Sequence, residues 1–433
     1  MRVSLSASFS CSTNSNREHD PFHCSLHSAV MSRTILFGHP TGNPFAYHAA
    51  LAHREAGRLE AFCVAWMPSR TILRLVEQIG PLIPPAQRLA RREFAALDGA
   101  TLIQGPVGEI CRLLRRNLGQ GDRDTASEAN DWLMRTMTHE CRRSNVAAVH
   151  AYEDCSLWQF EEAGRLGKAC IYDMPIGYYP AWESLRSELG RKYADWMADD
   201  EAPLESKRTQ KRQEMELADV VLAPSSFVAD TIHRFHPHKT VALAPFGVDL
   251  AAWEPEPCRA PHDEITFLFA GQCSIRKGIP LLLEAWQAAG LRQARLRLVG
   301  FWGLAESKKK ELPAQCVWTG PIASSQLRRI YREADVFVFP TNFEGRALVV
   351  CEALASGLPV ITTYASGADD VVDDACGRII PPDDPEALVE ALRWFADNRH
   401  LLPELGRAAR SSVKRCTWAS YRRRVAEAVG PFV

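Results

Sequence analysis

Apolar runs separated by a polar loop stand out most clearly between residues 335 and 363. The order predicted there is strand, loop, helix and strand, at residues 336–339, 340–345, 347–355 and 359–361. These elements make one βαβ step of a parallel sheet. The loop lies at the carboxyl end of its strand, which is where open α/β sheets bind ligands. The stretch is therefore the first place to look for chemistry.

The first half of the chain shows the same alternation. A strand at 35–37, a helix at 46–56 and a strand at 61–66 predict another βαβ unit, and residues 70–145 have a largely helical pattern. Further strands end in loops of polar and aromatic residues, HAYED at 150–154 and DMPIGYY at 173–179. Residues 183–216 read as charged helix, and Ser225 or Ser226 is expected to cap a helix from Phe227. Several polar loops are thus expected at one edge of a sheet.

The βα alternation restarts in the second half. Helix 279–289 carries an apolar stripe at i, i+3, i+4 and i+7, typical of a helix that covers a sheet. Strands are expected at 265–271, 296–299 and 317–318, with a helix at 325–333. After residue 363 we expect a long loop, a helix from Pro385 capped by Asp383 or Asp384, and a basic amphipathic segment at 418–429.

A chain of 433 residues is too long for one ordinary core, so two domains are expected. The fold class predicted is α/β, with two doubly wound, Rossmann-like domains facing each other across a cleft. The predicted divisions are a lead-in, an N-terminal domain, a linker, a C-terminal domain and a final helix that returns to the first domain, at 1–30, 31–245, 246–262, 263–416 and 417–433. The lead-in reads either as disordered or as translation assigned upstream of a start at Met31.

Composition narrows the class of protein. With 46% hydrophobic and 24% charged residues and a net charge of −1, the chain is a poor match for a nucleic-acid-binding protein. No apolar run approaches the ~18–20 residues of a membrane span. The 13 cysteines are scattered without CxxC, which favours reduced thiols over disulfides or metal ligands. We expect a cytoplasmic protein, with peripheral association at the inner face of the membrane through its basic helices as an addition.

Arg276, Lys277 and Gly278 are the first candidate for chemistry. They lie between the end of a strand and the start of a helix. The unpaired N–H groups at a helix start carry a partial positive charge, and the two side chains add full ones. Such a loop can hold a diphosphate without a metal ion. The plainer interpretation is a solvated cationic pair.

Glu344 and Glu352 are the second candidate. On a single helix their eight-residue separation would span about 12 Å. That exceeds the roughly 5–9.5 Å between the carboxylates of a glycoside hydrolase, so we do not read them as an acid–base pair. They read as acceptors for hydroxyls on an elongated ligand, with anion-binding amides from Gly345, Arg346, Ala347 and Leu348 between them. Two solvated glutamates remain the alternative.

In the first half, Gly42 in HPTGNP is the candidate for close backbone approach to a ligand, with an ordinary turn glycine as the equal alternative. His150, Tyr152, Glu153 and Asp173 follow or end strands and are the candidates for an acceptor side. No GxGxxG occurs, so a dinucleotide-dependent dehydrogenase lacks its fingerprint.

These residues resemble the GT-B glycosyltransferases of group 1, family-four type. The resemblance is carried by FEGRALVVCEALASGLPVITT, with PFGVD, AGQCSIRKGIPLLLEAW, YREADVFVFPT and GADDVVDDACGRIIPPDDPEAL in the family's order. It implies a retaining, metal-independent transfer of a sugar from a nucleotide diphosphate sugar to a hydroxyl acceptor, with no required cofactor. The donor would bind the second domain, and the acceptor would bind the first. The acceptor can be a glycan, a lipid-linked molecule or a small molecule.

The same resemblance implies roles for individual residues. Arg276 and Lys277 would stabilise the leaving diphosphate. Glu344 would contact the donor sugar and Glu352 the ribose hydroxyls, and Gly42 would lie in the loop that reaches the phosphates.

The sequence also departs from the family pattern. Gln272 stands where many members have arginine, Arg346 replaces an apolar residue, and Tyr152 stands where many have histidine. These departures keep alternatives open, namely a non-catalytic nucleotide-sugar-binding partner subunit and an epimerase or phosphorylase on the same fold.

Overall fold

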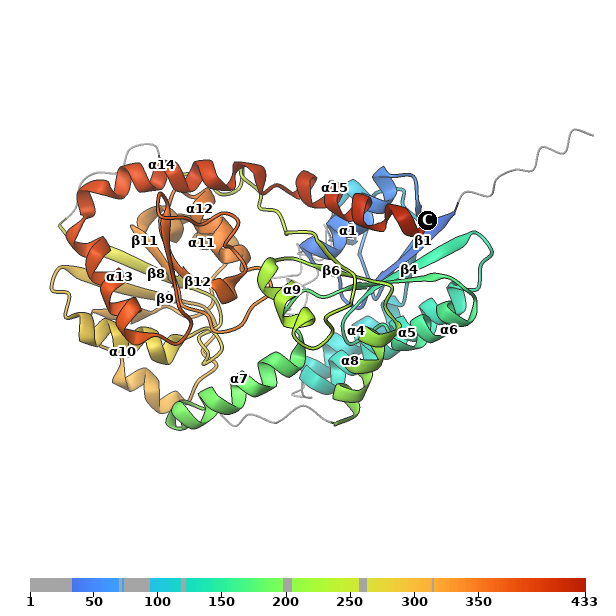
Figure 1. The fold of residues 1–433 in the computed structure, drawn as a ribbon, viewed down its shortest axis with the longest axis horizontal. Coiled ribbons are helices and arrows are strands. Elements are labelled where there is room, and N and C mark those ends of the chain that lie inside the picture. Colours follow the sequence, from blue (N-terminus) through green and yellow to red (C-terminus); the bar gives the residue numbers. More distant parts are fainter. Residues whose placement is uncertain are drawn as a thin grey trace, which may run out of the picture. The chain divides into compact units, whose positions relative to one another are not determined.

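Two parallel sheets organise the chain in a computed structural model (Figure 1). The structure describes residues 33–69, 72–73, 94–117, 122–197, 205–256, 263–313 and 315–433. The expectations for residues 1–30, for 257–262 of the predicted linker and for much of 70–93 lie outside these ranges. The predicted fold class is confirmed, since each sheet is parallel and flanked by helices, as in a doubly wound domain.

The first sheet has seven strands in the order β3-β2-β1-β4-β5-β6-β7. Its strands are β1 (Thr34–His39), β2 (Leu59–Val64), β3 (Leu102–Gln104), β4 (Val146–Tyr152), β5 (Ala169–Asp173), β6 (Val220–Ala223) and β7 (Val241–Leu243). Its helices are α1 (Pro44–Glu55), α4 (Pro106–Asn117), α5 (Asp122–Glu140), α6 (Leu157–Arg165), α7 (Tyr179–Lys192), α8 (Glu205–Leu217) and α9 (Ser226–His233). Strand order reverses between β1 and β4, which makes this pair a topological switch point.

The second sheet has six strands in the order β10-β9-β8-β11-β12-β13. Its strands are β8 (Ile265–Ala270), β9 (Ala294–Val299), β10 (Cys316–Trp318), β11 (Val336–Phe339), β12 (Val360–Thr363) and β13 (Gly377–Ile380). The helices that follow are α10 (Ile279–Ala289), α11 (Ser324–Glu333), α12 (Leu348–Ala355), α13 (Pro385–Asp397), α14 (Leu402–Ser412) and α15 (Trp418–Val429). Here the switch point lies between β8 and β11.

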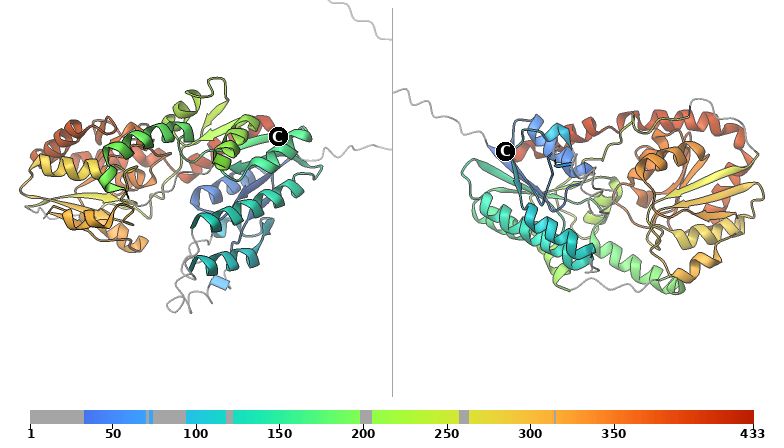
Figure 2. Two further views of the ribbon diagram at one scale, coloured as in Figure 1. Left: turned by 90° about the horizontal axis from the view of Figure 1, so that it is seen from below. Right: turned by 180° about the vertical axis from the view of Figure 1, so that it is seen from behind.

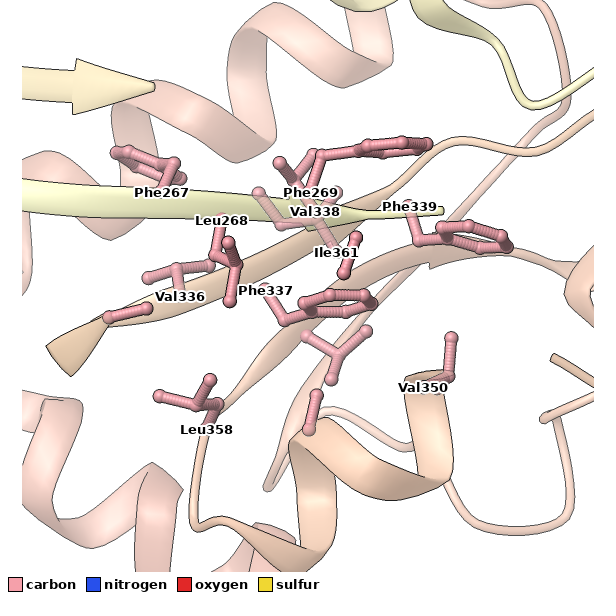
Figure 3. Close-up of a cluster of buried hydrophobic side chains, with 14 of the residues drawn as sticks. Phe267, Leu268, Phe269, Val336, Phe337, Val338, Phe339, Val350, Leu358 and Ile361 are labelled. Carbon is pink, nitrogen blue, oxygen red and sulfur yellow. The ribbon is translucent and has the colours of Figure 1, made fainter. Parts of the chain in front are cut away.

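The centre of the second sheet is fully buried. Phenylalanine side chains from β8 and β11 lie against one another, with Phe269 and Phe339 stacked at a centroid distance of 5.5 Å (Figure 3). Strands covered on both faces read as continuous apolar runs, which is why 336–339 was easy to identify. This packing fixes the ends of β8 and β11 beside each other, and the loops that leave them start from a rigid base.

Helix caps follow the expected chemistry. The Ser225 hydroxyl accepts from the Val228 amide at 3.3 Å, and Asp384, one of the two expected caps, accepts from Ala387 at 2.9 Å. Asn43 caps α1 in the same way, accepting from Ala46 at 2.9 Å. Each cap satisfies an amide that the first helical turn leaves unpaired.

Three elements differ from the sequence-based expectation. Strand β3 interrupts the stretch expected to be largely helical, and β13 lies within the expected long loop. The charged stretch 183–216 contains two helices, α7 and α8, not one continuous run. Each short strand offers too few alternating positions for its period to be recognised.

Helix α15 packs against α1 of the first sheet (Figures 1 and 2). Arg422 donates to Glu55 at 2.8 Å, and Trp418 stacks on His48 at 4.4 Å. Tyr421 and Val425 are buried in the core of the first sheet. Among the described residues, no helix combines the length and apolar character that crossing a bilayer requires. The predicted domain limits remain a prediction.

Candidate functional site

The loops that leave β8 and β11 meet at the switch point of the second sheet. Residues 271–278 follow β8, and residues 340–347 follow β11. Because the two strands are hydrogen-bonded neighbours, their carboxyl ends place both loops at one edge. The candidate cations and the candidate carboxylate Glu344 are thereby brought together, as the sequence predicted.

Glu344 lies between the two cations. The Arg276 guanidinium donates to Glu344 Oε1 at 2.8 Å and to the Phe343 carbonyl at 2.9 Å. The Lys277 ammonium contacts the same carboxylate oxygen. The Glu344 side chain is only 13% exposed, and that of Lys277 is equally covered. One carboxylate thus contacts two partly desolvated basic side chains.

Burial shifts the protonation of these cations. Loss of hydration, reinforced by the charge of Arg276, lowers the pKa of Lys277 to about 6. Burial also lowers the pKa of Arg276. The Lys277 ammonium lies 5.0 Å from the centre of the Phe339 ring, an attractive cation–π position. A site with two such desolvated cations favours an anionic ligand, because the anion would restore the stabilisation that water no longer supplies.

Backbone contacts hold the two loops in register. The Arg276 carbonyl accepts from the Asn342 amide at 2.8 Å and from the Thr341 hydroxyl at 3.1 Å. The Asn342 side chain donates to the Ile275 carbonyl at 3.2 Å. Gly278 has φ +73°, and a Cβ atom there would lie 2.0 Å from the Pro340 carbonyl oxygen. Only glycine therefore allows this close approach. The sequence did not point to Thr341 and Asn342, because residue identity alone does not show which backbone groups a side chain contacts.

The predicted anion-binding amides are partly engaged. The Ala347 amide donates to the Ser366 carbonyl at 2.8 Å. The amides of Gly345, Arg346 and Leu348 have no acceptor within the described ranges, at the point where α12 begins. Three of the four predicted donors therefore remain free to bind an anion, and such binding stays a prediction.

Glu352 lies in the middle of α12, partly exposed. Burial raises its pKa to about 7. A carboxyl group with this pKa exchanges its proton near neutral pH, and donors such as ribose hydroxyls would favour its ionised form. Its role as a ribose contact stays a prediction.

The guanidinium of Arg346 is fully engaged within the protein. Its side chain is completely buried and forms an ion pair with Asp370 at 2.6 Å. It also donates to the carbonyls of Phe246 at 3.2 Å and Gly367 at 3.0 Å and to the Cys416 sulfur at 3.1 Å. The sequence places Arg346 at the expected donor site, and that assignment stays a prediction. The side chain, however, is used for contacts between chain segments.

The loop after β5 also reaches the Glu344 loop. The Gly177 amide donates to the Glu344 carbonyl at 3.2 Å, and the Ser225 hydroxyl donates to the Gly345 carbonyl at 2.6 Å. A Cβ atom on Gly345 would lie 1.7 Å from the Pro175 carbonyl oxygen. Sequence analysis predicted Ser225 only as a possible helix cap, and its second contact needed the three-dimensional arrangement.

Gly42 lies in a turn closed on His39. It has φ +72°, and its amide donates to His39 Nδ1 at 2.8 Å. A Cβ atom there would lie 2.6 Å from the Tyr47 ring. The glycine is thus required by the turn itself, and its approach to a ligand stays a prediction.

The candidate acceptor-side residues lie in the interior of the first domain. His150 is fully buried, with its Nδ1 2.8 Å from His53 Nε2 and its Nε2 3.5 Å from Asp173. Burial lowers the pKa of His150 to about 3 and raises that of Asp173 to about 8. The two groups are thus both neutral at pH 7.

Tyr152 and Glu153 continue this buried group. Tyr152 is 3% exposed and packs edge-on against His39 at 4.8 Å. Glu153 pairs with Lys211 at 3.0 Å, and burial raises its pKa nevertheless. None of these four side chains is exposed, and their contact with an acceptor stays a prediction.

Residues 254–412 match the family model described as "Glycosyl transferases group 1". A sulfoquinovosyl transferase of Arabidopsis thaliana is 31% identical over 158 residues, which cover 35% of this chain and 30% of that protein. The chain spans 30% to 58% of the length of the curated relatives that it matches.

Solved structures extend the similarity over nearly the whole fold. Sucrose-phosphate synthase from Thermosynechococcus elongatus has a TM-score of 0.63 at 18% identity, covering 91% of this chain and 98% of its own. Anabaena HepE, in complex with UDP and glucose, has a TM-score of 0.56 at 13% identity, covering 92% and 100%. At these identities the likeness shows the fold, which is GT-B.

Proposed function

We propose that the chain transfers a sugar from a nucleotide diphosphate sugar to a hydroxyl acceptor, because residues 254–412 match the model of the group 1 glycosyl transferases. The observation that carries the proposal is the Arg276–Glu344–Lys277 cluster at the switch point of the second sheet, inside the matched region. The bound UDP in the Anabaena HepE structure supports a nucleotide diphosphate as the carrier of the sugar.

Arg276 and Lys277 would stabilise the diphosphate as it leaves. The bond between the sugar carbon and the phosphate oxygen breaks with growing negative charge on that oxygen, and fixed cations at a helix start lower the energy of this state. The new bond joins the acceptor oxygen to the sugar carbon, and the acceptor proton passes to the departing diphosphate. We propose that the configuration at the sugar carbon is retained and that no divalent metal is required.

Glu344 would change partners when the donor binds. In the structure its carboxylate accepts from both cations. A diphosphate would compete for the same cations and release the carboxylate toward the hydroxyls of the sugar. The loop would thus exchange an internal ion pair for one with the substrate, while the contacts of Thr341 and Asn342 keep the backbone in place.

Replacement of Lys277 or Glu344 by alanine tests this assignment. We expect each to lower acceptor-dependent release of nucleoside diphosphate by about 10²–10³-fold, the usual effect of losing one group that stabilises transition-state charge. The measurement uses the full chain, a panel of nucleotide sugars and several hydroxyl acceptors. Lys310→Ala, at an exposed lysine of the same domain, should retain full turnover.

Product analysis separates the alternatives. A new glycosidic bond with retained configuration, seen by NMR, and turnover unaffected by EDTA would support the full proposal. A free epimerised nucleotide sugar or a sugar phosphate would favour an epimerase or a phosphorylase. Unchanged turnover in both alanine variants would refute the site.

A further inference from the structure

Phe343 is a buried aromatic residue that lies outside both main cores. It directly precedes Glu344 in the loop after β11, and only 3% of its surface is exposed. As far as the described residues go, the apolar cores of the two sheets do not include it. Its ring is therefore buried by contacts that the loop makes elsewhere in the chain.

The ring packs against three residues from the first half of the chain. Its centroid lies 5.4 Å from that of Trp182, on α7, and 5.4 Å from that of Phe227, on α9. Ring centroids about 4.5–7 Å apart are typical of attractive aromatic pairs. The tip of the ring faces Gly177, where an added Cβ atom would come within 2.5 Å of the ring Cζ. We call Gly177, Trp182 and Phe227 the Phe343 clamp.

The backbone of Phe343 holds Arg276. Nη1 of the Arg276 guanidinium donates to the Phe343 carbonyl at 2.9 Å and to Glu344 Oε1 at 2.8 Å. A bound diphosphate would compete with the carboxylate for this guanidinium. The hydrogen bond to the Phe343 carbonyl is the contact that would remain, so the position of this carbonyl would determine where the guanidinium points.

Hydrogen bonds fix the backbone on both sides of Phe343. The Asn342 amide donates to the Arg276 carbonyl at 2.8 Å, and the Gly177 amide donates to the Glu344 carbonyl at 3.2 Å. The second bond comes from a residue of the Phe343 clamp, which therefore holds both the ring and the next peptide group. Without the ring, the Phe343 carbonyl would lose the packing that fixes it beside Arg276.

We propose that Phe343 is a positioning residue of the candidate site, whose ring, held by the Phe343 clamp, fixes the carbonyl that orients Arg276 toward the leaving diphosphate. Phe343 acts through Arg276 and itself contacts neither the sugar nor the phosphates. Its effect on turnover rests on the proposed function, whereas its effect on the loop does not. A displacement of about 1 Å in a group that acts on the reacting atoms can lower a rate by about 10²-fold.

Steady-state kinetics of Phe343→Ala and Phe343→Leu test this role. Loss of the ring should lower kcat for nucleoside diphosphate release about 10–100-fold and change KM for the nucleotide sugar less than threefold, because the guanidinium still reaches the bound diphosphate but no longer faces the developing charge. Leucine keeps apolar bulk in the clamp and should restore most of kcat. Rates are expressed per folded molecule, with the folded fraction taken from urea unfolding, since a purely structural role would leave kcat per folded molecule unchanged.

Gly177→Ala perturbs the same contact from the other side. The added Cβ would lie 2.5 Å from the Phe343 ring, so the ring or the loop must move, and kcat should fall as in Phe343→Ala. In the double variant the two effects should not add, because both remove one contact. Gly164→Ala, on α6, is the matched control. Its added Cβ meets nothing within 4 Å, and it should keep full kcat.

Hydrogen exchange of the full-length protein without ligand gives a readout that does not depend on the reaction. The amides of Asn342 and Gly177 should exchange about tenfold faster in Phe343→Ala than in the unaltered protein, and at nearly the unaltered rate in Phe343→Leu. An unaltered chain that releases no nucleoside diphosphate would refute the proposed function, and exchange would then decide on the loop contact alone. Unchanged exchange in Phe343→Ala, or a kcat per folded molecule equal to that of the unaltered protein, would overturn the role of Phe343.

Discussion

Lys277 combines a position suited to binding an anion with a lowered pKa. With a pKa of about 6, the side chain is mostly neutral at pH 7.5. A diphosphate can use it fully only after it gains a proton. The charge that makes the site useful is therefore supplied by the ligand's arrival.

Binding of a nucleoside diphosphate should accordingly take up protons. We expect an uptake approaching one proton per site at pH 7.5 and an affinity that falls as pH rises above 6, since protonation then costs more free energy. Calorimetry in two buffers of different ionisation enthalpy measures the uptake. Lys277→Met should bind more weakly and lose it, whereas proton release by the unaltered protein would contradict the assignment.

Asp173 gives a pH dependence of the same direction, in folding stability instead of in ligand binding. Burial raises its pKa from 3.8 to about 8, so the folded chain keeps a proton that the unfolded chain releases between pH 4 and pH 8. Its contribution to stability is complete below pH 4 and is lost progressively up to pH 8, by at most about 1.4 kcal/mol per pH unit.

Asp173→Asn should therefore flatten the decline of stability between pH 4 and pH 8. Urea unfolding at a series of pH values measures the slope. The exposed Asp397→Asn serves as control and should keep the slope of the unaltered protein. Equal slopes for the protein and Asp173→Asn would show that the carboxyl group is ionised in the fold.

The sequence predicted which residues lie near the switch point between β8 and β11. It did not predict the orientation of their side chains. The family resemblance implies that Arg276, Lys277 and Glu344 contact one donor, and the structure brings the three side chains together. Arg346 lies in the same loop, yet its guanidinium donates to the Phe246 carbonyl. The identity of a loop residue does not show where its side chain points. That orientation decides whether the side chain can bind a ligand or instead stabilises the fold.

At the scale of elements, the periodicity of apolar residues predicts the long helices and the buried strands. Helix α10 has the predicted bounds, because its apolar stripe and the flanking glycines mark both ends. Helix α14 received no assignment from the sequence. It contains Gly406, a poor helix former, at which a Cβ atom would lie 2.5 Å from the Gly357 carbonyl oxygen. The close packing of α14 against the end of α12 thus requires glycine at position 406. The same glycine makes the helix hard to predict from the sequence.

The Glu344 loop depends on a similarly close approach. In Gly345→Ala the new Cβ would lie 1.7 Å from the Pro175 carbonyl oxygen, so the loop or its neighbour must move. We expect a loss of about 1–3 kcal/mol in unfolding free energy and a large fall in nucleoside diphosphate release. Gly108→Ala, where the added Cβ meets nothing within 4 Å, is the matched control; it should keep full nucleoside diphosphate release and, because it lies in helix α4, should not lower the free energy of unfolding. A fully active Gly345→Ala would show that the contact is dispensable.

At the scale of the whole molecule, α15 belongs by packing to the sheet that is farthest from it in sequence. Tyr421 is 1% exposed, within the core formed by β1, β4 and β5. The length of the chain and its two runs of βα units predicted two domains. They could not show how deeply a short basic segment enters the first core, since only three of its residues are buried.

Tyr421→Ala should destabilise the first sheet by about 3–5 kcal/mol, the usual cost of truncating a large buried aromatic side chain. Urea unfolding followed by hydrogen exchange of β1 and β4 measures it. Tyr421→Phe keeps the ring and should cost far less. Equal effects of the two substitutions would assign the stability to the hydroxyl group instead of to packing.

The packing of α15 against the first sheet also determines when the core of that sheet can be completed during synthesis. A ribosome releases β1 to β7 long before residues 418–429, and until those residues emerge the apolar surface that Tyr421, Val425 and Val429 cover stays open. The half of the protein that is made first is therefore completed last. Its exposed core during translation is a natural surface for a chaperone, which would be released when the C-terminal helix docks.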